Sequence, residues 1–126
     1  MPLLDSAPII AFAATTDAGR AKAFYHDTLG LKLVEENGFA LVFDAAGTML
    51  RVQRVQEVLS GKYTALGWHV ADIEAKVDEL TAAGVRFENY SMPGQDQKGI
   101  WTPPGSNAKV AWFKDPDGNI LSLTQF

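Results

Sequence analysis

The sequence predicts an α+β domain built from two copies of one strand-helix-three-strand module. The first observation is an internal repeat: with Asp17 aligned on Asp72, both halves read strand, helix and then three short strands. The second is size, because 126 residues with 47% hydrophobic side chains suffice for one core and are too few for several domains. We expect a single domain over residues 1–126, with modules at 8–53 and 63–125.

Charge and composition exclude several classes of function. Eleven Lys and Arg against fifteen Asp and Glu give a net charge of −4 and a pI near 5.0. This balance offers no broad cationic surface for nucleic acid. Cysteine is absent, which excludes disulfides and thiolate metal sites. No apolar run is long enough for a membrane span, and the apolar start at 2–14 lacks the basic region of a signal peptide. We expect a cytoplasmic protein.

Two helices are predicted, over 17–30 and 72–84. Each carries an apolar face at helical intervals, formed by Ala18, Ala21, Phe24, Tyr25 and Leu29 in the first and by Ile73, Val77 and Leu80 in the second. Asp17 and Asp72 are expected to cap the helix N-termini. Gly30 and Gly84 are expected to end the helices in a left-handed conformation.

The other elements are predicted to be short strands joined by tight turns. Strands are expected at 8–16, 31–36, 39–44 and 48–53 in the first half, and at 63–71, 85–90, 109–115 and 119–125 in the second. Residues 44–47 and 115–118 are typical of hairpin turns. A short helical linker is predicted at 54–62. The Gly- and Pro-rich stretch 91–107 is either a lid over a site or an exposed insertion.

Two motifs resemble those of a known family, and the resemblance extends from about Ile9 to Gln125. The motifs are FYHDTLGLKL at 24–33 and AWFKDPDGNILSLTQ at 111–125. Together they resemble the vicinal oxygen chelate superfamily, which includes glyoxalase I, bleomycin-resistance proteins and extradiol dioxygenases. The resemblance implies paired modules that form a curled mixed sheet, a half-barrel around a cavity with helices on its convex side. It also implies a homodimer with cavities near the interface, sometimes with modules exchanged between chains.

The same resemblance implies four metal-ligand positions, which the internal repeat assigns to Ile10, Arg51, Ala65 and Ser122. Ile and Ala offer no donor atom, Arg is cationic, and a single Ser hydroxyl is a weak ligand. We therefore expect no metal and no other cofactor. The alternative is a metal bound through shifted ligands around His69.

Strand alternation assigns side chains to the cavity wall, because residues two apart share a face. The wall is expected to carry Ile10, Phe12 and Ala14; Met49, Arg51 and Gln53; Ala65, Gly67 and His69; and Ile120, Ser122 and Thr124. The opposite faces are uniformly apolar, which suits packing beneath helices. They comprise Ile9, Ala11, Ala13, Leu50, Val52, Leu66, Trp68, Val70, Leu121 and Leu123.

Arg51 and His69 are the candidate catalytic residues. A guanidinium in an apolar cavity suits bidentate capture of a carboxylate or phosphate. The alternative is that Arg51 reaches the rim or pairs with an internal Asp or Glu. His69 is suited to proton transfer near neutral pH, or it is a hydrogen-bonded core histidine. His26, the other histidine, is expected on the surface.

The candidate ligand-binding residues combine aromatic rings with hydrogen-bonding groups: Phe12, Arg51, Gln53, His69, Trp101, Trp112, Ser122 and Thr124. Core packing is the alternative for Phe12 and Trp112. No catalytic triad, phosphate loop or dinucleotide motif is present. The sequence thus favours metal-independent binding of a small organic anion or aromatic compound. The alternative is a glyoxalase-like lyase or isomerase with His69 as general base and Arg51 stabilising an oxyanion.

Overall fold

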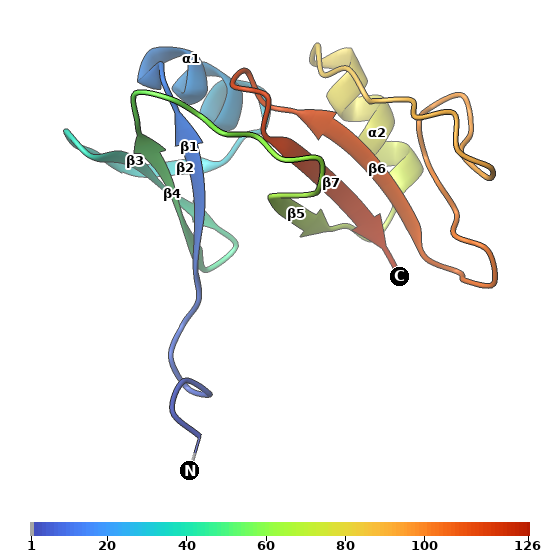
Figure 1. Ribbon diagram of the computed structural model, residues 1–126, viewed down its shortest axis with the longest axis horizontal. Helices are drawn as coiled ribbons and strands as arrows, with labels where there is room; N and C mark the ends of the chain where they lie inside the picture. The colour runs from blue at the N-terminus through green and yellow to red at the C-terminus, as the bar shows by residue number, and fades with distance from the viewer. Residues whose placement is uncertain (1) are drawn as a thin grey trace.

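The computed structural model describes residues 2–126 and has the expected α+β architecture of two modules side by side (Figure 1). The elements of the first module are β1 (Ile10–Thr15), α1 (Ala18–Lys22), the π-helix η1 (Ala23–Thr28), β2 (Lys32–Glu36), β3 (Ala40–Ala45) and β4 (Thr48–Arg54). Those of the second are β5 (Leu66–His69), α2 (Ile73–Ala82), β6 (Lys109–Lys114) and β7 (Ile120–Gln125). Within residues 2–126, no helix combines the length and apolarity that a membrane span requires.

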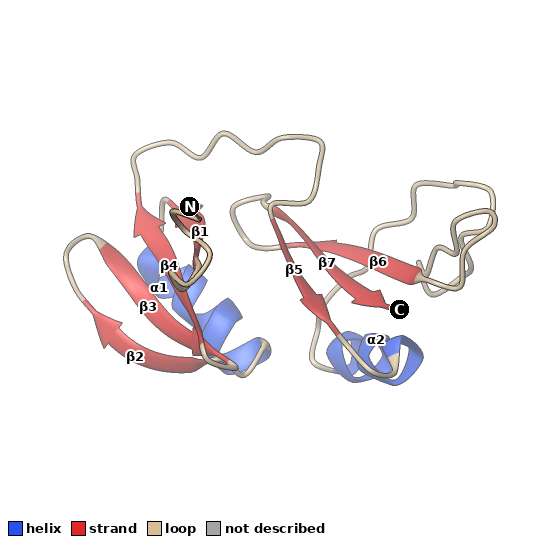
Figure 2. Ribbon diagram, turned by 90° about the horizontal axis from the view of Figure 1, so that it is seen from below, coloured by secondary structure: helices blue, strands red, loops and turns tan. Residues whose placement is uncertain are grey.

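The strands form two mixed sheets, one in each module, and do not close into a barrel. A four-stranded sheet has the order β1-β4-β3-β2, and a three-stranded sheet has the order β5-β7-β6. In each, the first strand of the module pairs in parallel with its last strand, and the remaining pairs are antiparallel. Figure 2 shows the helices on one side of these sheets and the chain between β4 and β5 passing over the gap between the modules.

Two elements predicted from the sequence are wrong. Residues 85–90 form only an isolated bridge, from Phe87 to Phe113, because the outer edge of β6 is shared with Trp101. The Trp101 backbone N–H donates to the Val110 carbonyl at 2.7 Å, and Val110 donates in return at 2.9 Å. The predicted helix at 54–62 is instead the irregular linker between the two sheets. A compact helix would shorten the chain where it must cross from one module to the other.

The predicted helix ends are confirmed. Asp17 accepts a hydrogen bond from the Arg20 N–H and Asp72 accepts one from the Ala75 N–H, each at 3.1 Å. Gly30 adopts φ +77°, the left-handed conformation that a helix end favours. The first helix widens into the π-helix η1, in which the Leu29 N–H donates to the carbonyl of Phe24 five residues earlier.

Burial follows the predicted alternation. The helix side of the sheets is closed, with Ala13, Leu50, Val52, Leu121 and Leu123 all buried in one core that spans both modules. Ile9 is the exception: it precedes β1 in the extended N-terminal arm of Figure 1 and is exposed. The core therefore needs both modules, because its residues come from both sheets and from all three helical segments.

A buried carboxylate joins the two modules. Tyr25, fully buried in η1, donates its hydroxyl to Asp115 Oδ2 at 2.6 Å. The other Asp115 oxygen accepts the backbone N–H groups of Asp117 and Asn119. The Asn119 side-chain amide donates to Asp115 Oδ2 at 2.7 Å and to the Ala14 carbonyl at 2.9 Å. Burial and the nearby charge of Asp115 raise the pKa of Tyr25 far above its ordinary value, so the phenol stays a donor.

Asp117, in the same turn, binds the start of α1. Its carboxylate accepts hydrogen bonds from the Thr15 hydroxyl at 2.6 Å and from the Thr16 N–H at 3.0 Å, and the Arg20 guanidinium lies 3.2 Å away. Burial tends to raise the pKa of Asp117, but these hydrogen bonds and the Arg20 charge outweigh it and lower the pKa below 3.8. The turn between β6 and β7 is thereby fixed to the first module.

We predict that Tyr25→Phe weakens the joint between the modules. Removing the hydroxyl leaves a buried carboxylate oxygen short of a donor, which costs about 2 kcal/mol of unfolding free energy. Urea denaturation followed by circular dichroism measures the loss. Tyr63→Phe is the matched control, because the Tyr63 side chain is 74% exposed and its loss of a hydroxyl should change stability by less than ~0.5 kcal/mol. Equal stability of the two variants would contradict the assignment.

We also predict an acid-sensitive contribution from Asp117. Its pKa is lower in the folded than in the unfolded protein, so the unfolded chain binds more protons between the two values. The stabilisation is complete above the unfolded pKa near 3.8 and is lost as pH falls through the lower folded value. Unfolding free energies measured from pH 6 down to about pH 2 should fall less steeply in Asp117→Asn than in the parent protein. Parallel curves would refute this role.

Candidate functional site

The side of each sheet that the helices leave uncovered carries the residues expected on the cavity wall. On the four-stranded sheet, Arg51 lies between Phe12 of β1 and Val42 of β3. Phe12 is 50% exposed, so it is not a core residue. Among residues 2–126 no carboxylate pairs with Arg51, which removes the internal-pairing alternative within the chain. The uncovered face of this sheet carries apolar side chains around Arg51, with the charged residues Asp44 and Lys32 beside Met49.

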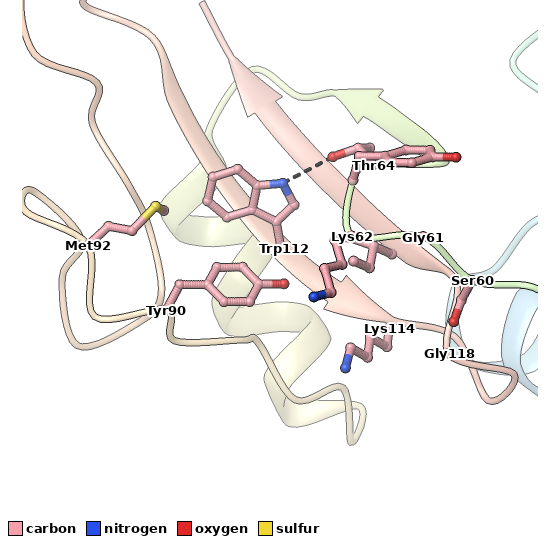
Figure 3. Close-up of a pocket in the computed structure, with 11 residues that line it drawn as sticks. Ser60, Gly61, Lys62, Thr64, Tyr90, Met92, Trp112, Lys114 and Gly118 are labelled. Carbon is pink, nitrogen blue, oxygen red and sulfur yellow. Dashed lines mark hydrogen bonds between the residues drawn. The ribbon is translucent and has the colours of Figure 1, made fainter.

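A large hollow lies on the three-stranded sheet. It measures about 690 Å³ and is bounded by β6, the β6–β7 turn, the linker and residues 90–92. We call it the aromatic hollow; its lining residues are Ser60, Gly61, Lys62, Tyr63, Thr64, Tyr90, Met92, Trp112, Lys114, Gly118 and Ile120. Figure 3 shows Trp112 and Tyr90 side by side, with the Tyr90 hydroxyl directed toward Lys62.

Trp112 is held in place from three directions. Its indole N–H donates to the Thr64 hydroxyl of the linker at 3.1 Å (Figure 3). Tyr90 meets it edge to face with ring centres 5.7 Å apart, and Trp101 lies against it at 5.8 Å. Such aromatic pairs add to the rigidity of the wall and leave ring surface for a flat ligand.

The charged residues of the aromatic hollow are two lysines, although the chain as a whole carries a net charge of −4. Lys114 lies 3.5 Å from Glu88 Oε1, and within the described chain no carboxylate pairs with Lys62. Burial and the charge of Glu88 raise the pKa of Tyr90, while Lys114 opposes them, so the phenol is a neutral donor at pH 7. The hollow therefore combines ammonium groups with aromatic surface.

The sequence-predicted residues are divided among different places. Trp112 lines the aromatic hollow and Trp101 supports it, while Ser122 is buried directly opposite Trp112 across β6 and β7. His69 and Thr124 lie opposite each other on β5 and β7. Phe12, Arg51 and Gln53 belong to the other sheet.

His69 is exposed, with its ring 5.3 Å from that of Phe126, so the core-histidine alternative is wrong. His69, the expected base, and Arg51, the expected oxyanion donor, lie on different sheets, so they are not neighbours on paired strands. His26 is exposed as expected, and its Nδ1 lies 2.7 Å from the Leu31 carbonyl oxygen.

Three residues of the aromatic hollow, Lys62, Tyr90 and Lys114, were not predicted from the sequence. Lys114 was recoverable, because it lies two residues from Trp112 on β6 and so shares its face. Tyr90 and Lys62 come from segments that the sequence assigned to a strand and a helix. Nothing in those local patterns indicated that they approach Trp112.

The four positions implied as metal ligands do not form a donor set. Ile10 pairs with Met49, Arg51 with Phe12, and Ser122 with Gly67, so none of these neighbours supplies a His, Asp or Glu. Over residues 2–126 no three His, Cys, Asp or Glu side chains gather closely enough to hold a metal ion. The side chains present do not fit an ordinary divalent-metal centre.

Comparison with solved structures gives the same fold over nearly the whole chain. A glyoxalase/bleomycin resistance protein/dioxygenase from Alicyclobacillus acidocaldarius matches with a TM-score of 0.72 and 16% identity, covering 96% of this chain and 92% of that one. The fosfomycin resistance protein FosX from Listeria monocytogenes gives 0.74 and 14%, with coverages of 96% and 93%. Lactoylglutathione lyase from Agrobacterium tumefaciens gives 0.69 and 20%, with coverages of 95% and 93%.

These identities are low, so the likeness concerns the fold and not the chemistry. No curated protein matches the chain. The model of the Glyoxalase/Bleomycin resistance protein/Dioxygenase superfamily, however, matches residues 9–123. The match spans both modules. The chain therefore belongs to the glyoxalase/bleomycin resistance protein/dioxygenase superfamily.

Proposed function

We propose that this protein binds a small, planar organic anion in the aromatic hollow without the help of a metal ion. The observation that carries the proposal is the lining itself: Trp112 and Tyr90 supply ring surface, and both charged side chains, Lys62 and Lys114, are cationic. In a chain with a net charge of −4, a hollow with this local balance favours an anionic ligand.

The volume suits a ligand of this kind. Small-molecule sites usually enclose about 300–1,000 Å³, and the hollow measures about 690 Å³. A flat ring stacked on Trp112 would leave its carboxylate or phosphate within the field of the two ammonium groups. The Tyr90 phenol adds a neutral hydrogen-bond donor on the same side. Glu88 already lies near Lys114, so we assign the stronger anion contact to Lys62.

Binding is better supported than catalysis. The donor-poor positions Ile10, Arg51, Ala65 and Ser122 argue for metal independence. The lyase or isomerase alternative relies on His69 as base and Arg51 as oxyanion donor, which belong to different sheets. Phe12, Gln53 and Thr124 remain proposed ligand contacts only if a second copy of the chain brings the two faces together.

A second copy is the occupant that we propose for the open face of the four-stranded sheet. Ile10, Phe12 and Met49 are 46%, 50% and 41% exposed there, around the unpaired Arg51. Exposed apolar area of this kind marks an interaction surface. A homodimer that covers this face with the aromatic hollow of the other copy would bury the apolar side chains and turn Arg51 toward a bound anion.

The ligand proposal predicts selective binding of aromatic carboxylates. We expect 2-naphthoate to bind and to raise the melting temperature, and Lys62→Ala to weaken its Kd about five- to tenfold, because one charge-assisted contact is lost. Isothermal titration calorimetry measures both proteins. Lys98→Ala, at an exposed lysine outside both the aromatic hollow and the four-stranded sheet, is the matched control and should bind like the parent.

Three further measurements test whether the binding needs a metal ion and whether the ligand is converted. Binding should survive dialysis against EDTA, and chromatography should return the naphthoate unchanged. Loss of binding with the chelator would overturn metal independence. Conversion of the ligand that is abolished in His69→Ala would replace the binding function by the enzymatic one. Equal affinity of the Lys62→Ala and parent proteins would remove Lys62 from the site.

The dimer proposal predicts a change of mass when the apolar face becomes charged. Phe12→Asp should convert the dimer to a monomer in light scattering coupled to size-exclusion chromatography, because a buried aspartate at the interface would be unpaired. Thr81→Asp, at an exposed residue of α2 on the helix side of the sheet, is the control and should stay dimeric. A parent protein that is monomeric at micromolar concentration would contradict the proposal.

A further inference from the structure

A second hollow lies on the opposite side of the three-stranded sheet from the aromatic hollow. It measures about 220 Å³ and occupies the seam between the end of η1 and the α2 helix. We call it the inter-helix hollow. Its lining is apolar apart from two residues and comprises Leu29, Leu31, Trp68, His69, Val70, Lys76, Leu80, Phe113 and Leu123. No step of the proposed function uses this space.

The chain leaves this space open for an identifiable reason. The first helical segment ends at Thr28, and Gly30 at φ +77° turns the chain so that Leu29 and Leu31 reach one side of the seam. Leu80 of α2 reaches the other side, and all three leucines are only half buried. The space is open to solvent on one side, so these apolar side chains leave surface exposed to water.

The floor of the inter-helix hollow is aromatic. Trp68 and Phe113 stack with ring centres 6.3 Å apart and an angle of 20° between their planes. An apolar protein cavity of roughly 150 Å³, lined by leucine, isoleucine and phenylalanine, is large enough to bind benzene and stays free of water. The inter-helix hollow, at about 220 Å³, has room for a single ring with a small substituent.

Charge distinguishes this hollow from the aromatic one. Lys76 Nζ donates to Glu79 Oε2 at 2.8 Å, so its charge is already matched by a neighbouring carboxylate. The remaining polar lining residue, His69, borders the hollow, but alternation along β5 puts its ring on the other face of the sheet from Trp68, beside Phe126. An anion entering here would be repelled by Glu79 beside the lining lysine, whereas a neutral ring would meet no such repulsion.

We propose that the inter-helix hollow is a second binding site, which takes a compact uncharged aromatic molecule of phenol size. The ring lies between the three leucines against Trp68, which is stacked on the fully buried Phe113, and its small polar substituent points to the open side of the hollow. This site is independent of the aromatic hollow, because the two lie on opposite faces of the sheet and select different charges.

The test uses p-cresol as the neutral probe and p-toluate as its anionic counterpart. Methyl-resolved NMR of the full chain should show saturable shifts of Leu29, Leu31 and Leu80 with p-cresol, and p-toluate should perturb these methyls at least about tenfold more weakly because burying its charge is costly. Leu80→Phe fills the space and should abolish the p-cresol shifts, and Leu31→Phe is the second variant should Leu80→Phe fail to fold.

Lys62→Ala separates this proposal from the previous one. That variant is expected to lose affinity for 2-naphthoate and to retain the p-cresol shifts at the three leucines. Shifts confined to the surroundings of Trp112, equal effects of p-cresol and p-toluate, or persistence of the leucine shifts in a folded Leu80→Phe or Leu31→Phe protein would each overturn the second site.

Discussion

The buried carboxylate of Asp115 is the interaction on which the arrangement of the two modules depends. An ionised carboxylate removed from water is costly unless its oxygens are hydrogen-bonded. Here both oxygens are satisfied, by the Tyr25 hydroxyl, the Asn119 amide and two backbone N–H groups of the turn. Because Tyr25 belongs to the first module and the turn to the second, satisfying this one group fixes the helix of one module on the hairpin of the other.

This joint has consequences for both hollows. The β6–β7 hairpin that it anchors carries Trp112 and Lys114 on one face and Phe113 and Leu123 on the other. A single rigid hairpin thereby presents two chemically different surfaces. The face that the helices leave free is cationic and aromatic, whereas the face toward the helices is apolar with its lysine neutralised by Glu79. Sites on sheet elements of this kind are held more precisely than sites built only from loops.

Ile10, Arg51, Ala65 and Ser122, the positions that the resemblance implies as metal ligands, carry no side chain that binds a divalent metal strongly. A fold of this kind is stabilised by its apolar core and by the Asp115 joint, neither of which involves those four positions. Their side chains are therefore able to change without loss of the fold. That freedom explains how a member with cationic and aromatic groups in its concave faces keeps the same strand and helix order.

Most of the fold was predictable because it depends on local physical rules. Asp17 and Asp72 cap helices wherever a helix begins beside them, and alternation along β4 and β7 separated Leu50, Val52, Leu121 and Leu123 from Arg51 and Ser122. Trp112 was a candidate ligand contact because its ring is able to stack on a planar ligand, and alternation applied to β6 would have added Lys114.

Only the tertiary structure decided what surrounds Trp112 and how the sheets divide. Lys62 lies on a linker that the sequence favoured as a helix, because local propensity is overridden where the chain must cross between modules. Tyr90 lies on a segment that the sequence favoured as a strand, where Trp101 shares the edge of β6 and leaves only the bridge from Phe87 to Phe113. That Arg51 and His69 lie on different sheets likewise follows from which strands pair, a long-range choice that a single sequence does not encode in neighbouring residues.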